Sequence, residues 1–355
     1  MSDKQIKNLL VTGGCGFIGS NFIRYLLEES SFSGRIINVD KLTYAGNPES
    51  LSDIMAMHGS RCSFEKLDIC DLPGLERVFS DYSVDGVAHF AAESHVDRSI
   101  ASPGVFIDTN IRGTFNLLEC ARKAGDQFKL FHHVSTDEVY GTLGKSGYFT
   151  EATPYSPNSP YAASKAASDH LVRACHKTYG LPVTISNCSN NYGPFQFPEK
   201  LIPLMVLNAM EGKPLPVYGD GSNVRDWLYV RDHCIGIWTI MERGTPGRTY
   251  NIGGGCEMEN LAIVGKICDI IDNAGKKAPG VSSSRDLITF VKDRPGHDFR
   301  YAIDCSRINQ ELGWRPQESL ETGLEKSVLW YFDNMEWVRR IRTGDYLNWI
   351  ETHYG

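Results

Sequence analysis

The sequence VTGGCGFIG at residues 11–19 decides the fold. Its glycines Gly13, Gly16 and Gly19 follow a short apolar run and open a segment with helical periodicity. At this spacing Gly13 permits a tight turn, Gly16 lets backbone amides approach a pyrophosphate, and Gly19 lets the helix pack closely on the preceding strand. The start of the helix adds unpaired N–H groups and a partial positive charge. The motif therefore predicts a turn that binds the pyrophosphate of a dinucleotide.

The rest of the first half continues to alternate strand and helix. Short apolar runs, which predict buried strands, occupy residues 7–12, 35–39, 63–67, 86–91, 130–135 and 183–187. Amphipathic segments, which predict helices, occupy residues 18–28, 75–81, 105–124 and 162–179. Strict alternation favours an α/β fold with a mostly parallel, doubly wound sheet of the Rossmann type.

The pattern changes after about Asn190, where proline and glycine become frequent and the segments become irregular. We therefore expect a dinucleotide-binding domain over residues 1–190 and a smaller substrate-binding lobe formed mainly by residues 191–355. Segments within 235–255 are expected to return to the first domain, which makes the C-terminal lobe discontinuous.

The composition narrows the class of protein. The chain has 355 residues, 41% hydrophobic and 22% charged, which suits one large domain with or without a smaller partner. A net charge of −7 gives no basic footprint for nucleic acid. We see neither a signal peptide nor a run of ~20 apolar residues, so we expect no membrane span. The 10 cysteines lack the spacing of zinc sites or disulfides, so we expect free thiols, no metal and a cytoplasmic location.

Two acidic residues end further predicted strands. Asp40 ends the second strand, where a carboxylate accepts hydrogen bonds from the adenosine ribose and repels a 2′-phosphate. Asp40 therefore favours NAD over NADP, with Lys41 beside it. Asp68 ends the next strand and is expected near the adenine. A cap or turn role is the alternative for either carboxyl.

A tyrosine and a lysine share one face of a predicted helix. Tyr161 and Lys165 form YxxxK within SPYAASKAASD, and the i, i+4 spacing places both side chains together. An ammonium beside a phenol stabilises the phenolate, so we expect the pKa of Tyr161 to lie below its usual value of about 10. The tyrosine is then able to take a proton from a sugar hydroxyl, and the lysine to hold the nicotinamide ribose.

Several longer motifs reveal a resemblance to a known family. The segments TGGCGFIG, FAAESHVDRS (90–99), STDEVYG (135–141) and SPYAASKAASD (159–169) together resemble the extended short-chain dehydrogenase/reductase superfamily. Within it, NCSNNYGPFQFPEKLIP (187–203), YGDGSNVRDWLYVRDH (218–233) and DRPGHDFRYAID (293–304) are similar to the dTDP-glucose 4,6-dehydratase family. The resemblance extends from residue 7 to about 333. It implies an NAD-dependent hydro-lyase that oxidises C4 of a nucleotide-linked glucose, removes water across C5 and C6, and returns hydride to C6.

The acidic pair Asp137-Glu138 is the feature that separates dehydration from epimerisation in this resemblance. Neighbouring side chains in a strand point to opposite faces, so the chain must leave the strand here for both carboxyls to face one sugar. The resemblance implies that Glu138 removes the C5 proton, that Asp137 protonates the leaving 6-hydroxyl, and that Thr136 orients the 4-hydroxyl. Like charges in a dry pocket oppose double ionisation, so Asp137 is expected to start protonated. A nucleotide-sugar 4-epimerase, another nucleotide-sugar 4,6-dehydratase or a non-catalytic sensor are the alternatives.

The resemblance also assigns binding residues, and it implies a nucleotide-diphosphate sugar as the substrate. Those expected at NAD are Gly13, Gly16, Phe17, Ile18, Gly19, Asp40, Lys41, Asp68, Ile69, Ala91, Glu93, Thr109, Tyr161 and Lys165. Those expected at the nucleotide sugar are Ser94, Thr136, Asn190, Lys200, Leu201, Tyr218, Arg225, Asn260, Arg294 and His297. Arg225 and Arg294 suit a diphosphate because guanidinium offers a bidentate fork, although an ion pair with Asp226 or Asp232 is the alternative for Arg225.

The two longest predicted helices also bear on assembly. Many members of this superfamily form homodimers by packing two long helices of each subunit into a four-helix bundle, and residues 105–124 and 163–179 are the candidates here. The apolar residues of these helices fit either that interface or the face that packs on the sheet. These are Phe106, Leu117, Leu118, Leu171 and Val172.

Overall fold

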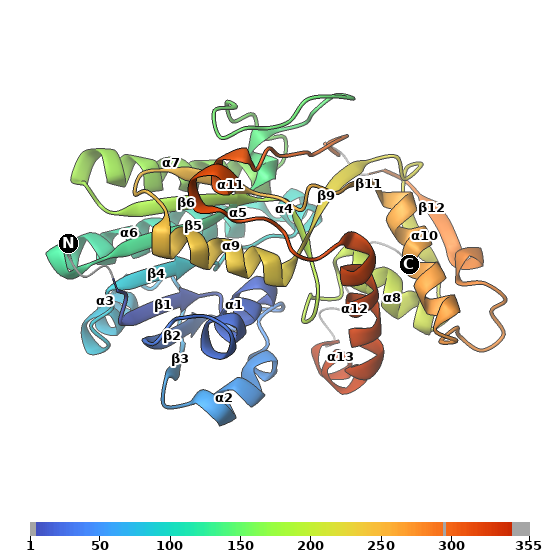
Figure 1. Ribbon diagram of the computed structural model, residues 1–355, viewed down its shortest axis with the longest axis horizontal. Coiled ribbons are helices and arrows are strands. Elements are labelled where there is room, and N and C mark those ends of the chain that lie inside the picture. The colour runs from blue at the N-terminus through green and yellow to red at the C-terminus, as the bar shows by residue number, and fades with distance from the viewer. Residues whose placement is uncertain (1–4, 294–295, 343–355) are drawn as a thin grey trace.

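A seven-stranded parallel sheet with the order β10-β6-β5-β4-β1-β2-β3 is the centre of the larger lobe (Figure 1). The computed structural model describes residues 5–293 and 296–342. From β1 the chain adds β2 and β3 on one side, and it then adds β4, β5 and β6 on the other side, so the strand order switches between β1 and β4. In doubly wound sheets, ligands bind at such a switch point, outside the carboxyl ends of the strands. The strands are β1 (Asn8–Thr12), β2 (Arg35–Asp40), β3 (Cys62–Lys66), β4 (Gly86–His89), β5 (Leu130–Thr136), β6 (Val183–Cys188) and β10 (Thr249–Ile252).

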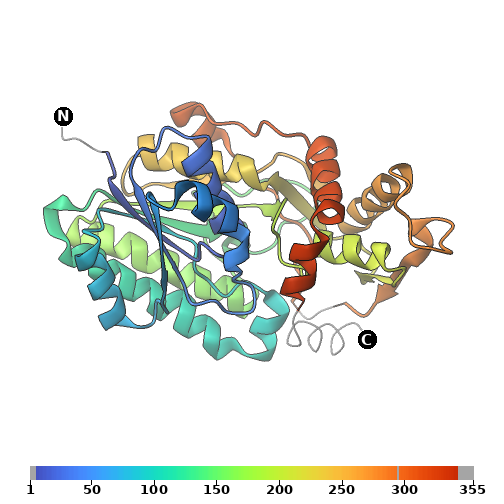
Figure 2. The same cartoon turned by 90° about the horizontal axis from the view of Figure 1, so that it is seen from below.

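Helices cover both faces of this sheet, which Figure 2 shows as three layers. One apolar core lies under α1 (Phe17–Glu28), α9 (Val230–Arg243) and α11 (Ser306–Leu312). The other lies under α3 (Leu72–Asp81), α6 (Thr114–Lys123) and α7 (Pro160–Tyr179). Because helices bury the strands from both sides, the sequence of each strand is a nearly continuous run of apolar residues. The predicted doubly wound α/β fold is confirmed.

The smaller lobe packs four helices around a separate apolar core. A three-stranded sheet of the order β11-β9-β7 and a parallel pair of β12 and β8 complete it. Its elements are β7 (Asn190–Tyr192), α8 (Leu201–Met210), β8 (Leu215–Tyr218), β9 (Val224–Tyr229), β11 (Glu257–Glu259), α10 (Asn260–Asn273), β12 (Ile288–Val291), α12 (Leu320–Asp333) and α13 (Met335–Ile341). Between these segments the chain returns to the larger lobe, where α9 packs on α1 and β10 pairs with β6. The proposed division at residue 190 stays a prediction.

Two features differ from the sequence prediction. The 3-10 turn η1 (Pro48–Leu51), α2 (Ser52–His58) and α4 (Val96–Ala101) were not predicted, because helices this short do not establish a hydrophobic period. The single helix expected at 105–124 is instead α5 (Pro103–Phe106), a π-helical segment η2 (Ile107–Gly113) and α6. The remaining short turns are the 3-10 segments η3 (Gly125–Gln127), η4 (Asp137–Tyr140) and η5 (Ser284–Leu287).

Two global properties complete the description. In the described part of the chain, no helix combines the length and the apolar character that crossing a bilayer requires. All ten cysteines lie within the described residues, and each is a free thiol.

Candidate active site

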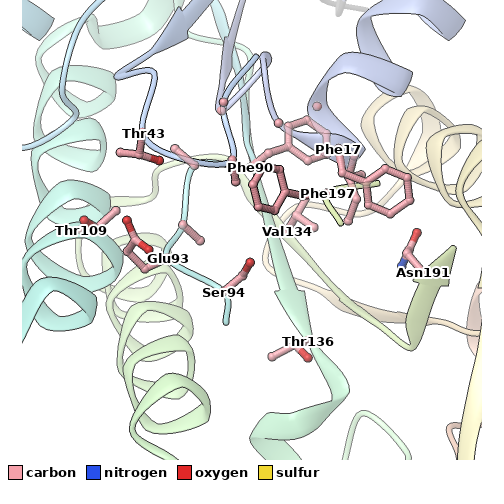
Figure 3. A pocket seen from close by; sticks show the side chains of 18 of the residues that line it. Phe17, Thr43, Phe90, Glu93, Ser94, Thr109, Val134, Thr136, Asn191 and Phe197 are labelled. Carbon is pink, nitrogen blue, oxygen red and sulfur yellow. The ribbon is translucent and has the colours of Figure 1, made fainter. Parts of the chain in front are cut away.

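A cavity of about 320 Å³ lies at the carboxyl ends of β1, β2, β4 and β5 and extends to the start of the smaller lobe. Figure 3 shows Thr136 at the end of β5 and Glu93 and Ser94 in the segment after β4, all lining this cavity. Most of the predicted site residues line it. They are Gly13, Gly16, Phe17, Ile18, Gly19, Asp40, Lys41, Asp68, Ile69, Ala91, Glu93, Ser94, Thr109, Thr136, Asp137, Glu138, Tyr161, Lys165, Asn190 and Lys200.

The glycine turn brings the start of α1 against the ends of β1 and β4. Gly13 has a φ of +71°, and a Cβ there would lie 2.7 Å from the backbone nitrogen of Ala91. A Cβ on Gly19 would lie 2.2 Å from the carbonyl oxygen of Gly13. Gly16 is the N-cap of α1, and no side chain caps this helix. The first amides of α1 therefore border the cavity beside Gly16, where a helix end attracts an anion.

Asp40 ties the glycine turn to the end of β2. Its Oδ2 accepts a hydrogen bond from the backbone N–H of Cys15 (2.9 Å), and its Oδ1 accepts one from Leu42 (2.8 Å). Burial raises the pKa of the Asp40 carboxyl, and the two hydrogen bonds oppose that rise. A carboxylate has about four lone-pair sites, so Asp40 keeps acceptor capacity toward the cavity.

Lys41 and Asp68 form an ion pair at the same end of the cavity. The Lys41 Nζ lies 2.7 Å from Asp68 Oδ2, and Asp68 Oδ1 accepts a hydrogen bond from the backbone N–H of Cys70 at 2.9 Å. Asp68 therefore stabilises a turn through its hydrogen bond to Cys70, which was the alternative role, and it also lines the cavity.

Tyr161 and Lys165 are buried one turn apart in α7. Lys165 Nζ donates a hydrogen bond to the carbonyl of Val134 at 2.9 Å, and Tyr161 lines the same cavity as Thr136 at the end of β5. The expectation of a low tyrosine pKa is wrong for the chain without a ligand. Burial, followed by the charge of Glu138, raises the pKa of Tyr161 well above its ordinary value. Removing a phenol from water disfavours the phenolate more than the spacing of the motif alone indicates.

Asp137 and Glu138 leave the strand as their proposed roles require. β5 ends at Thr136, and η4 begins at Asp137, where the hydroxyl of Thr136 accepts a hydrogen bond from the Glu138 backbone N–H at 3.3 Å. Both carboxyls line the cavity. Asp137 is 2% exposed, and its Oδ2 has no hydrogen-bond partner among the described residues. Burial first, and the charge of Glu138 second, raise the pKa of Asp137 well above its ordinary value. The site therefore combines a carboxyl group whose protonated form is favoured by burial with a second carboxyl group beside it.

The segment that carries Glu93 is held by Asn110 of η2. The Asn110 side chain accepts a hydrogen bond from the Glu93 backbone N–H (2.9 Å) and donates to the Glu93 carbonyl (3.0 Å) and to the Ser164 hydroxyl (2.8 Å). The neighbouring carbonyl of Ser94 accepts a hydrogen bond from Lys200 at 3.0 Å. π-Helical segments recur at functional sites, and this one links the cavity wall to α7.

Five residues expected at the nucleotide sugar are not among those that line this cavity, and their contact with the substrate stays a prediction. Tyr218 donates to Asp97 (3.4 Å), and His297 Nδ1 lies 2.6 Å from Asp293 Oδ1. The other members of this group are Leu201, Asn260 and Arg225. Leu201 and Asn260 are the first residues of α8 and α10. Arg294 lies outside the described residues.

Arg225 has a structural role in the smaller lobe. It is 4% exposed and donates to the carbonyls of Val224 (2.7 Å), Asp298 (2.9 Å) and Phe299 (3.3 Å). Its guanidinium lies 4.3 Å from the centre of the Tyr301 ring. The guanidinium therefore holds the 298–299 backbone, which the sequence spacing did not indicate.

A buried cluster around Glu199 escaped the sequence analysis. Glu199 lines the cavity, and its Oε2 accepts a hydrogen bond from Arg98 of α4 at 3.1 Å. The Arg98 guanidinium lies 3.9 Å from the centre of the Tyr44 ring, which meets Phe197 edge to face. Arg98 and Glu199 both occur in the quoted motifs, but they are 101 positions apart, so no local sequence pattern indicates that they form a pair. Other lining residues that the sequence analysis missed include Thr43, Ala45, Gly46, Cys188, Ser189, Asn191 and Gln196.

Comparison with known proteins gives a consistent result over nearly the whole chain. Residues 10–327 match the family model described as GDP-mannose 4,6 dehydratase. The chain is 55% identical to a dTDP-glucose 4,6-dehydratase of Neisseria meningitidis serogroup B, over 96% of this chain and 98% of the relative. It is 53% identical to the enzyme of that name from Salmonella typhimurium, over 98% of each.

Solved structures agree with these relatives. The crystal structure of the dTDP-glucose 4,6-dehydratase DesIV from Streptomyces venezuelae, with NAD and a second ligand bound, matches with a TM-score of 0.87 and 48% identity. The match covers 94% of this chain and 99% of that chain. A UDP-glucose 4-epimerase of Thermotoga maritima matches with a TM-score of 0.81 and 29% identity, over 92% and 99% of the two chains.

Proposed function

The chain belongs to the GDP-mannose 4,6 dehydratase family within the extended short-chain dehydrogenases/reductases, and we propose that it is an NAD-dependent dTDP-glucose 4,6-dehydratase. It converts dTDP-D-glucose to dTDP-4-keto-6-deoxy-D-glucose and water, and is thus a hydro-lyase. One observation carries the proposal beyond the family: the buried carboxyl of Asp137, whose Oδ2 has no hydrogen-bond partner among the described residues, shares a cavity with the Glu138 carboxyl, Tyr161 and Lys165. Oxidation of the sugar at C4 alone would not require this pair of carboxyl groups.

The residues present fit NAD. The uncapped start of α1 offers amides to a pyrophosphate, and a Cβ on Gly16 would meet only the Gly13 carbonyl, at 3.2 Å, so the space before it is open. Asp40 would hold the adenosine ribose, and Lys165 the nicotinamide ribose. When bound, NAD supplies reversible hydride acceptance, from C4 of the sugar and back to C6.

Tyr161 acts as the base toward the sugar 4-hydroxyl. Thr136, which lines the same cavity, orients that hydroxyl for proton transfer. To accept that proton Tyr161 must first be a phenolate, with its own proton released to solvent, whereas burial raises its pKa in the chain without ligands. The Lys165 ammonium, one turn along α7, would stabilise that phenolate.

Glu138 and Asp137 carry out the elimination. Oxidation at C4 makes the C5 hydrogen acidic, and Glu138 removes it as a proton, acting as a general base; a proton is returned to C5 when hydride is added at C6. Asp137, protonated because burial raises its pKa, gives its proton to the departing 6-hydroxyl. The two carboxyls thus divide the roles of acid and base through their different burial, with Asp137 buried and Glu138 half-buried.

We propose in addition that the chain functions as a homodimer in the cytoplasm. Phe106, Leu117, Leu118 and Val172 are buried against the larger lobe. Other apolar residues of the same segments face outward: Val105 is 50% exposed, Ile107 56% and Phe115 46%. Such a patch suits the packing of helices between subunits. Light scattering would give twice the chain mass, and a lysine at Phe115 would give the mass of one chain.

Mass spectrometry of dTDP-glucose incubated with the purified protein tests the function. Loss of one water without added NAD is expected, since the cofactor is regenerated in each turnover. UDP-glucose in parallel is expected to react more slowly. An unchanged mass with galactose appearing would identify a 4-epimerase and refute the proposal.

A further inference from the structure

A fully buried polar network lies behind Lys165, on the side away from the cavity. Asp169, one turn further along α7, is 0% exposed, and its Oδ1 lies 3.2 Å from His133 Nε2. The same His133 nitrogen lies 3.5 Å from Lys165 Nζ. Asp169, His133 and Lys165 therefore form a continuous chain between β5 and α7.

The charge balance around Lys165 singles out Asp169. The ionisable groups that act on the ammonium are His89 of β4, His133 of β5, Cys188 of β6, and Asp169 of its own helix, in addition to Tyr161. Burial lowers the pKa of His133 to about 4 and raises that of Cys188 to about 12, so both are neutral near pH 7. Among these described neighbours, Asp169 is the anion.

The surroundings of Asp169 keep it ionised. Its Oδ2 accepts hydrogen bonds from Ser135 Oγ (2.9 Å) and from the Tyr155 hydroxyl (2.7 Å). Arg173 in turn donates to the Tyr155 hydroxyl at 2.6 Å. Burial raises the pKa of Asp169, but its interactions with His133, Lys165 and Tyr155 together bring the pKa below its usual value. Three polar partners around one buried carboxyl are more than packing requires.

We propose that Asp169 is a positioning residue for the dehydration, a buried counter-ion that acts with His133 to keep Lys165 charged and in place beside Tyr161. A lone ammonium in the interior loses its proton, whereas a carboxylate within a few ångströms stabilises the charged form. The role of Asp169 in catalysis rests on the proposed function, whereas its effect on the charge state of Lys165 does not depend on which reaction the protein catalyses.

The test titrates Lys165 directly. In protein labelled with ε-¹³C-lysine, the Lys165 signal is assigned by its absence from Lys165→Met and followed with pH in the chain without substrate. We expect Asp169→Asn to lower the Lys165 pKa by about 1–3 units, the effect of one nearby opposite charge. In turnover assays the alkaline limb of kcat should move down by a similar amount, with KM changed less.

Asp232→Asn is the matched control. Asp232 is also buried, and its Oδ2 accepts from the backbone N–H groups of Gln317 (2.9 Å) and Glu318 (2.8 Å), away from Lys165. It should lower the thermal midpoint without moving the Lys165 titration. A titration of Lys165 that is the same in folded Asp169→Asn and in the wild type would overturn the proposal.

A second variant covers the case in which Asp169→Asn does not fold. Ser135→Ala combined with Tyr155→Phe keeps the Asp169 carboxyl but removes two of its hydrogen bonds. It should shift the Lys165 titration in the same direction by a smaller amount, and no shift would contradict the proposal. Because the titration needs no substrate, a chain that catalyses another reaction would still give the expected shift.

Discussion

Replacing Asp137 with asparagine isolates the acid step of the proposed elimination. Asparagine has nearly the shape of a protonated aspartic acid, and Asp137 is 2% exposed with a raised pKa, so the variant should fold with the same packing. It loses only the proton that it would release to the leaving hydroxyl. Loss of a positioned general acid reduces a rate about 10²–10⁴-fold, equivalent to about 2.7–5.5 kcal/mol in the barrier.

Two measurements on Asp137→Asn distinguish the acid role of Asp137 from the base role of Glu138. Water loss from dTDP-glucose, followed by mass spectrometry, should fall by the stated factor. Exchange of the C5 hydrogen in deuterated water should continue, since Glu138 remains. Asp85→Asn is the control: its carboxylate accepts from the backbone N–H of Lys7 and Asn8 beyond the opposite end of the strands, so it should lose stability but not turnover. Water loss at the wild-type rate near neutral pH would refute the acid role of Asp137.

Four further predictions follow from the same geometry. Tyr161→Phe should fold normally but turn over about 10²–10⁴-fold more slowly, and near-normal turnover would remove the tyrosine from the mechanism. Gly19→Ala would place a Cβ 2.2 Å from the Gly13 carbonyl, so urea unfolding should show a loss of about 1–3 kcal/mol, and unchanged stability would mean that the turn adjusts freely. Asp40→Asn should weaken NAD binding at least about tenfold in calorimetry, because a hydrogen bond to a charged group contributes about 1.5–3 kcal/mol, and equal affinity would contradict the ribose contact. The folded-state pKa of Asp137 is raised, so its contribution to stability is complete below the unfolded pKa near 3.8 and is lost as the pH rises toward the folded pKa. The thermal midpoint of Asp137→Asn should therefore rise relative to that of the wild type as the pH increases above 4. A difference between the two midpoints that does not change with pH would show that Asp137 does not titrate differently on folding.

Periodicity and glycine spacing were sufficient for the architecture of the larger lobe. Each predicted strand there exists, and so does each predicted helix except the single one expected at 105–124, because amphipathic periods and buried apolar runs reflect burial directly. The departure of the chain from β5 at Asp137 could also be predicted, since two adjacent carboxyls share one site only if the strand ends.

Features set by tertiary contacts could not be predicted. The π-helical segment η2 turns Asn110 toward Glu93 and Ser164, and no pattern in the sequence marks that widening. The Arg98–Glu199 pair joins residues distant in the chain. The rise in the pKa of Tyr161 follows from burial that the YxxxK spacing does not reveal.

In the proposed reaction, C4 is oxidised, water is removed and the hydrogen taken from C4 is returned to C6, all within one cavity. The most direct measurement uses dTDP-glucose carrying deuterium at C4, with nuclear magnetic resonance of the product. The account predicts a 4-keto-6-deoxy sugar that has lost one water and carries the deuterium at C6. Deuterium that stays at C4 in a galactose product, or that exchanges into solvent, would contradict it.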